Sequence, residues 1–90
     1  MRVKVPEQVV FRELENETVL LNLSTGFYFG LDDVGTRMWL ALEKHGTLEQ
    51  AVFDLLDEFE VESAELQRDL QSLAQELCDQ GLLEIVHEQD

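Results

Sequence analysis

Side chains that could do catalytic chemistry are few and isolated in this sequence. His45 follows a predicted helix, His87 lies near the end of the chain, and Cys78 is the single cysteine. A histidine at a helix C-terminus is commonly a partner of the helix dipole. A cysteine beside an apolar helical stripe is commonly a small core residue. The sequence therefore predicts no nucleophile and no acid–base pair, and we do not expect an enzyme.

Motifs that hold a metal ion or a phosphate are also missing. Metal ligands are commonly spaced as Cys-x-x-Cys or His-x-x-x-His, and neither pattern occurs. Gly26 and Gly30 are four residues apart but lack the lysine of a phosphate-binding loop. Acidic pairs such as Asp32 with Asp33 are too frequent in this chain to specify a site. We expect neither a metal nor a cofactor.

The acidic side chains gather in the second half of the chain. The whole sequence has a net charge of −14, and residues 45–90 carry thirteen acidic side chains against Arg68 alone, a net of −12. Acidic helix faces keep a small protein soluble. The same field repels phosphate backbones and favours a neutral or basic partner. The charge distribution therefore argues against nucleic acid.

Length and apolar content indicate one globular domain over residues 1–90. Ninety residues with 44% apolar side chains can bury a single modest core. Residues 1–6 are not followed by the apolar stretch of a signal peptide, and no apolar run approaches the ~20 residues that cross a bilayer. A lone cysteine cannot form an internal disulfide and fits a reducing compartment. We expect a cytoplasmic protein that does not bind membranes.

Three strands are predicted to position any site in the first third of the chain. Residues 9–14 and 18–23 flank a short turn, and residues 27–31 follow a Ser-Thr-Gly turn. Alternation puts Tyr28 on the opposite face from Phe27 and Phe29. The apolar sets expected on the face that needs a cover are Val19, Leu21 and Leu23, then Phe27, Phe29 and Leu31.

Three helices are predicted to supply that cover. The first begins at a cap on Asp32 or Asp33 and ends at Gly46. The second begins at Thr47 and runs through Phe59. The third is expected to be capped by Ser63, to end at Gly81 and to precede a short strand over residues 82–86. The inward positions predicted for the first helix are Val34, Met38, Trp39, Ala41 and Leu42, and those for the third are Leu66, Leu70, Leu73, Ala74 and Leu77.

This order predicts an α+β fold of the winged helix-turn-helix type. It consists of a three-stranded antiparallel N-terminal sheet, three helices and a short C-terminal strand. DNA binding is the usual alternative for such a fold, and its recognition helix needs cations for phosphates. The candidate helix, residues 63–80, instead carries Glu65, Asp69, Glu76 and Asp79 against Arg68. A DNA-binding regulator is therefore disfavoured.

Peptide binding by strand addition fits the third predicted strand better. The segment Phe27-Tyr28-Phe29-Gly30 is short, aromatic and uncharged, and no proline or lysine protects it. An extended segment could bond to its free N–H and C=O groups. Tyr28 has a polar tip suited to a wet groove, whereas Phe27 and Phe29 could equally be core. A purely structural subunit of an enzyme complex is a third possibility.

Two segments resemble the PqqD-like family. The residues Ser24-Thr25-Gly26-Phe27-Tyr28-Phe29-Gly30-Leu31-Asp32-Asp33-Val34-Gly35-Thr36-Arg37-Met38-Trp39 are similar to its "tGxYyxLN" strand and turn, followed by its "xxGxxIW" helix. The residues Leu77-Cys78-Asp79-Gln80-Gly81-Leu82-Leu83 resemble its closing "L-x-x-x-G-L-L/I". Asp32 stands where the family commonly has Asn. The resemblance covers nearly the whole chain.

The resemblance implies a noncatalytic element that binds the leader of a ribosomally made precursor peptide. In related structures the leader adds as an antiparallel strand to the third strand and packs against the third helix. The peptide-binding residues implied for this chain are Phe27, Tyr28, Phe29, Gly30, Leu31, Leu66, Asp69, Leu70 and Leu73. Leu70 and Leu73 could equally be core, and Asp69 could contact the leader or pair near Arg68 or with Arg37.

The resemblance implies two alternative sets of enzyme partners. Similarity to the leader-binding proteins of lasso-peptide systems implies a leader peptidase and a cyclase. Similarity to PqqD itself implies a radical-SAM enzyme of PQQ biosynthesis and its precursor. The style of residues 24–39 resembles the lasso branch more closely.

Overall fold

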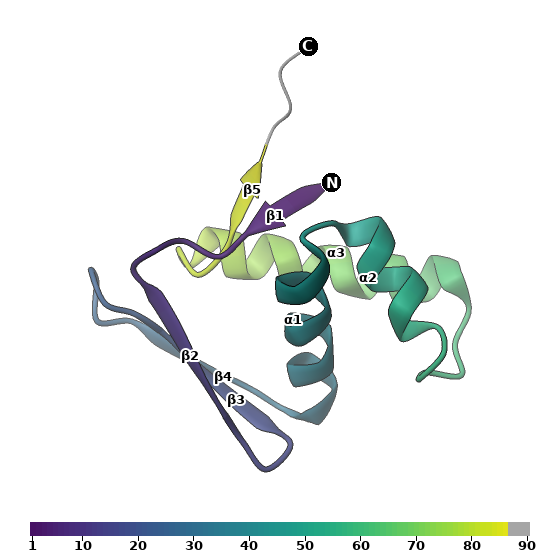
Figure 1. Cartoon of the computed structure of the whole chain (residues 1–90), viewed down its shortest axis with the longest axis horizontal. Coiled ribbons are helices and arrows are strands. Elements are labelled where there is room, and N and C mark those ends of the chain that lie inside the picture. Colours follow the sequence, from purple (N-terminus) through teal and green to yellow (C-terminus); the bar gives the residue numbers. More distant parts are fainter. Residues whose placement is uncertain (87–90) are drawn as a thin grey trace.

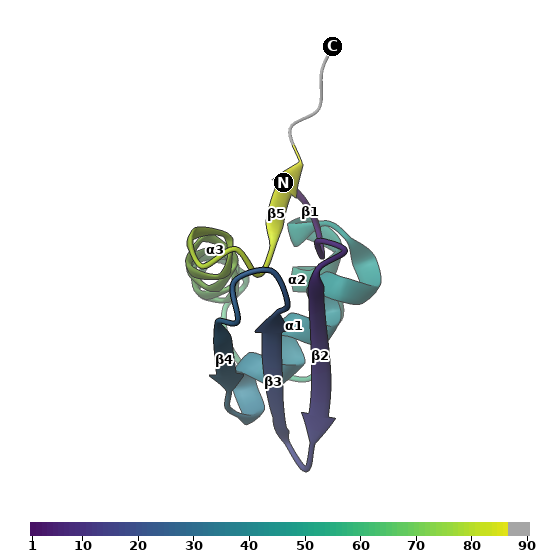
Figure 2. The same ribbon diagram turned by 90° about the vertical axis from the view of Figure 1, so that its left-hand side faces the viewer.

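A three-stranded sheet with helices on one face forms most of the molecule. The computed structural model describes residues 1–86. The sheet has the order β2-β3-β4, with both pairs antiparallel, and Figure 2 shows the helices on one side of it. The α+β prediction is confirmed. The elements in chain order (Figure 1) are β1 (Arg2–Lys4), β2 (Val9–Leu14), β3 (Glu17–Asn22), β4 (Tyr28–Leu31), α1 (Asp33–His45), α2 (Leu48–Leu55), α3 (Ser63–Asp79) and β5 (Glu84–Val86).

The face of β3 that the helices cover is not the predicted one. It carries Thr18, Leu20 and Asn22, which are all buried. The prediction failed because β3 has apolar side chains on both faces, so that alternation alone could not decide between them. The residues wrongly expected on the covered face are Val19 and Leu23, which are exposed, and Leu21, which is half-buried.

Local capping signals set the helix boundaries as predicted in most places. The Asp32 carboxylate accepts a hydrogen bond from the Gly35 amide at 2.8 Å, and the Thr47 hydroxyl accepts one from the Gln50 amide at 3.2 Å. Gly46 ends α1 with a φ of 72°, a left-handed conformation that glycine adopts without strain. Ser63, however, is the first residue of α3, and the N-cap is Glu62, which makes no side-chain capping bond.

The core lies between the sheet and the three helices. Trp39 is fully buried and forms an edge-to-face pair with Phe11, with the ring centroids 5.4 Å apart. The predicted stripes are confirmed for most positions of α1 and α3, but Val34, in the first turn of α1, is 47% exposed. α2 ends at Leu55 rather than at Phe59, and Phe59 packs half-buried against the core.

A second, two-stranded sheet joins the two ends of the described chain. β1 pairs antiparallel with β5 in the register Val3 to Ile85, and this partner of the closing strand was not predicted. The Val3 amide also donates to the Gly46 carbonyl at 2.9 Å, which anchors β1 beside the end of α1. None of the helices within residues 1–86 is long and apolar enough to cross a membrane.

Candidate functional site

β4 is an edge strand, and its outward backbone groups can be assigned from the ladder. The Asn22 amide donates to the Phe27 carbonyl at 2.9 Å, so this pair is hydrogen-bonded. Bonded and non-bonded pairs alternate in an antiparallel ladder. The next bonded pair is therefore Leu20 with Phe29, while Tyr28 and Gly30 direct their N–H and C=O groups away from β3. These groups form an unpaired edge without proline or lysine to protect it.

The side chains of β4 divide between the two faces of the sheet. Phe29, opposite Leu20, is half-buried, and Leu31, opposite Thr18, is buried on the helix side. Tyr28 is on the other face and is 71% exposed. Gly30 leaves open space, because a Cβ there would meet no atom within 4 Å. β4 begins at Tyr28, so Phe27, which is 40% exposed, belongs to the preceding turn rather than to the strand.

α3 lies on the same side of the molecule as the free edge of β4. Both elements are on the far side in Figure 1 and at the left in Figure 2. Leu73 is half-buried and Asp69 is exposed, so both side chains have surface that solvent can reach. Leu66 and Leu70 are only 2% and 0% exposed. They pack in the core beneath α3 and, in this structure, offer no surface to a peptide.

Asp69 does not pair with Arg37 as one alternative expected. The Arg37 guanidinium instead contacts Asp33 at 3.5 Å and Glu58 at 3.7 Å. It also lies 5.7 Å from the centroid of the Phe59 ring. Among residues 1–86 no ion pair involving Asp69 is formed, which leaves its carboxylate available to a partner.

Asn22, which was not among the predicted site residues, connects the start of β4 to the end of α3. Its side-chain oxygen accepts hydrogen bonds from the amides of Ser24 at 2.9 Å and Thr25 at 3.2 Å. Its Nδ2 donates to the Gly81 carbonyl at 2.9 Å. Gly81 has a φ of 75°, and a Cβ there would lie 3.3 Å from that Nδ2. An Asn before a Ser-Thr-Gly turn was the available signal, because Asn side chains commonly close such turns.

Replacing Asn22 should therefore disturb both elements of the candidate site, β4 and α3, together. An Asn22→Ala variant leaves the Gly81 carbonyl and two turn amides without their partner, so we expect the free energy of unfolding to fall by about 1–3 kcal/mol. Asn22→Asp keeps the acceptor of the turn but loses the donor to Gly81. Chemical denaturation measures the loss, with the exposed Ser24→Ala as the control. An unchanged stability in both Asn22 variants would contradict this role.

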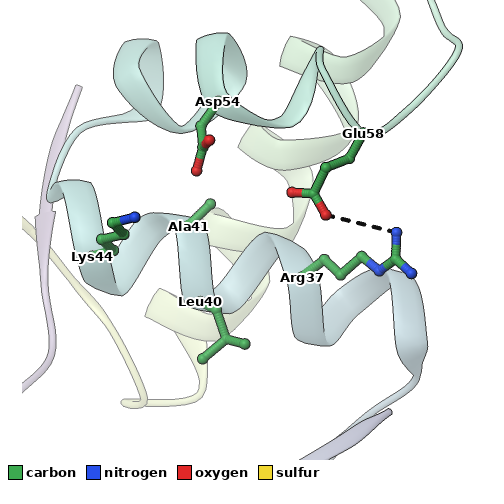
Figure 3. Close-up of a pocket in the computed structure, with 6 residues that line it drawn as sticks. All are labelled: Arg37, Leu40, Ala41, Lys44, Asp54 and Glu58. Atoms are coloured by element: carbon green, nitrogen blue, oxygen red, sulfur yellow. Dashed lines mark ion pairs between the residues drawn. The ribbon is translucent and has the colours of Figure 1, made fainter.

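Two further ion pairs join α1 to α2 and to the segment that follows α2. The six residues drawn in Figure 3 line a hollow of about 150 Å³, and among them Arg37 and Glu58 point toward each other. Near it, His45 Nε2 lies 3.0 Å from Asp54 Oδ2, so that this histidine has a structural partner. Within residues 1–86 no group of three His, Cys, Asp or Glu side chains could hold a metal ion. His87 lies outside the described residues.

Comparison with known proteins decides the family. A family model described as "Coenzyme PQQ synthesis protein D (PqqD)" matches residues 17–83, which include β3, β4 and all three helices. The chain belongs to the PqqD family. The resemblance seen in the sequence is thereby confirmed. No curated protein matches the sequence.

Two solved structures share the PqqD-family fold over nearly the whole chain. The first, "TbiB1 in Complex with the TbiA(beta) Leader Peptide", is 38% identical, with a TM-score of 0.86, and the match covers 94% of this chain and 99% of that one. The second, "Lasso peptide synthetase B1 complexed with the leader peptide", has a TM-score of 0.83 and covers 94% and 100%. Because its identity to this chain is only 21%, this match supports the fold alone.

Proposed function

We propose that this chain binds the leader of a ribosomally made precursor peptide and presents the precursor to modifying enzymes. The leader adds as an antiparallel strand to the free edge of β4. The observation that carries the proposal is the unprotected edge, on which Tyr28 and Gly30 direct their backbone groups outward. The relative that is 38% identical over nearly the same length forms a complex with a leader peptide.

The side chains around this edge suit an extended peptide. Main-chain hydrogen bonds supply affinity in strand addition, and side-chain contacts supply selectivity. Tyr28 offers an exposed aromatic ring on one face, and Phe29 a half-buried one on the other. On the side of α3, Leu73 offers apolar surface and Asp69 a carboxylate. The proposed contacts are therefore Phe27, Tyr28, Phe29, Gly30, Leu31, Asp69 and Leu73, with Leu66 and Leu70 behind them.

The role is a noncatalytic one in our proposal, and its partners are processing enzymes. Residues 24–39 resemble the lasso branch, which favours a leader peptidase and a cyclase. A radical-SAM enzyme of PQQ biosynthesis is the alternative, and the family description agrees with it. We place the complex in the cytoplasm, where precursor peptides are made.

A binding assay with the leader encoded nearest this gene tests the proposal. Labelled leader should show saturable binding in fluorescence anisotropy, whereas a scrambled leader of the same composition should bind at least tenfold more weakly. The scrambled peptide controls for attraction between a basic peptide and an acidic chain. Equal binding of the two peptides would contradict specific recognition.

The same assay with duplex DNA tests the regulator alternative. α3 carries four acidic side chains against Arg68, and its exposed Glu65, Asp69, Glu76 and Asp79 would face the phosphates. We therefore expect no saturable binding of duplex DNA at physiological salt. Submicromolar affinity for duplex DNA would instead support a DNA-binding regulator.

A further inference from the structure

The three-stranded sheet has a second edge strand, β2, which is longer than β4. β2 has six residues against four in β4, and the two strands lie at opposite edges of the sheet (Figure 2). It carries no proline or lysine, and Val10, Phe11 and Leu14 are 46%, 37% and 49% exposed. A long apolar edge is commonly a place where a further strand adds. Length and apolar side chains alone would therefore favour β2 over β4 as the strand that a peptide extends.

Only a short part of the β2 edge has free backbone groups. The Leu23 amide donates to the Gln8 carbonyl at 2.7 Å, which fixes the bonded pairs of the β2–β3 ladder. By alternation, the groups that face away from β3 belong to Val9, Phe11 and Glu13. The Val9 amide is already bonded within the preceding turn, at 3.0 Å. A strand that adds to β2 must therefore bond to Phe11 and Glu13.

Glu13 places a carboxylate on this open part, at the margin of the face that the helices cover. It lies opposite Thr18, which is fully buried on that face, and two residues from Phe11, whose ring packs on Trp39. Glu13 itself is exposed, and within residues 1–86 its carboxylate forms no ion pair. A strand added here would take an unpaired carboxylate out of water, which is costly.

Arg12, the other charged side chain of β2, does not protect the edge in this way. It lies opposite Val19, which is 37% exposed on the face that the helices leave open. A long arginine side chain on an open face keeps its head group in water when a strand is added. β4 has no charged side chain at all. The carboxylate of Glu13 is thus the feature that distinguishes the two edges.

We propose that Glu13 prevents strand addition at β2 and so restricts the leader to β4. The proposal rests on the proposed function for the identity of the added strand. It makes Glu13 a residue that determines specificity without touching the leader, since it excludes a second, competing site on the same sheet. One chain then holds one precursor, on the edge that lies beside α3.

Exchange of the Phe11 amide in excess leader peptide tests this role, with the leader encoded nearest this gene. Glu13→Val removes the carboxylate and keeps the amide, and it is compared with three variants. Glu13→Asp keeps the charge, Glu13→Pro removes the charge and the amide together, and Glu7→Val makes the same change in the exposed turn before β2. Calorimetric titration counts the leader molecules bound per chain. Thermal melting checks that every variant is folded.

We expect Glu13→Val to slow exchange of the Phe11 amide at least tenfold in excess leader and to add a second, weaker binding event. Wild type and the three other variants should bind one leader each. Slowing that grows with protein concentration in the absence of leader would also support the blocked edge, with a second copy as the added strand. A Phe11 amide that exchanges at the wild-type rate in Glu13→Val, or that the leader already protects in wild type, would overturn the role of Glu13. The same second event in Glu7→Val would overturn it as well.

Failure of this role and failure of the proposed function give different results. Protection of the Phe11 amide in Glu13→Val by a second copy, in a chain whose Tyr28 amide the leader never protects, would keep the blocked edge and reject the proposed function. Leader protection of the Tyr28 amide, together with an unchanged Phe11 amide in Glu13→Val, would keep the proposed function and reject the role of Glu13.

Discussion

A Tyr28→Pro variant will lose most of its affinity for the leader peptide and keep its fold. Proline has no N–H, and its ring fixes φ near −65°. The Tyr28 N–H points to the free edge, so its loss removes a bond to the leader but none to β3. A hydrogen-bonding group left without its partner costs about 1–3 kcal/mol, so binding should weaken roughly tenfold or more. Calorimetric titration of folded protein measures the change.

Two matched variants distinguish the loss of the edge amide from the loss of the Tyr28 side chain and from a general effect of proline on the sheet. Tyr28→Val keeps the amide, so it should weaken binding less than Tyr28→Pro. Glu13→Pro places a proline on β2, at the opposite edge of the sheet. The Leu23 amide donates to the Gln8 carbonyl at 2.7 Å, so Gln8 and Leu23 form a hydrogen-bonded pair. Because bonded and non-bonded pairs alternate along the ladder, the Glu13 amide faces away from β3. Glu13→Pro should leave leader affinity unchanged. Wild-type affinity in folded Tyr28→Pro would contradict a site on this edge.

A Leu70→Ala variant will lose stability rather than specificity. Leu70 is fully buried in α3, and removing a buried leucine side chain costs about 2–5 kcal/mol, because the cavity left behind closes only partly. Domains of this size have about 5–15 kcal/mol in total, so the variant stands close to unfolding. Denaturant unfolding measures the loss, and leader affinity of the folded protein should change little.

Leu73→Ala is the control for that variant on the same helix. Leu73 is half-buried, so its truncation should cost less stability and should act more on leader binding than Leu70→Ala does. The opposite pattern, with full stability and lost binding in Leu70→Ala, would mean that α3 presents Leu70 to the peptide.

Local signals in the sequence were sufficient for the start and end of α1, for the start of α2 and for the edge strand. Asp32, Thr47 and Gly46 act through bonds within their own turn, so residue type and spacing alone predict them. The uncharged segment after the Ser-Thr-Gly turn likewise identified β4 as an unprotected edge. These features depend on few residues that are close in the chain.

Features set by distant contacts could not be predicted in the same way. Thr18 and Asn22 are polar yet buried, since β3 packs against helices that come later in the chain, and this reversed the expected face of the strand. β1 is only three residues long, and its pairing with β5 joins the two ends of the described chain. Leu66 and Leu70 share one apolar stripe with Leu73, and only packing distinguishes buried from accessible positions.

Hydrogen exchange at the β4 amides tests leader addition most directly. Exchange of each amide is followed by NMR in the free chain and with saturating leader peptide. Strand addition predicts that the amides of Tyr28 and Gly30 become protected, whereas the Phe29 amide, which already faces β3, is protected in both states. If Tyr28 and Gly30 exchange equally fast in the saturated complex, the leader does not extend the sheet at β4.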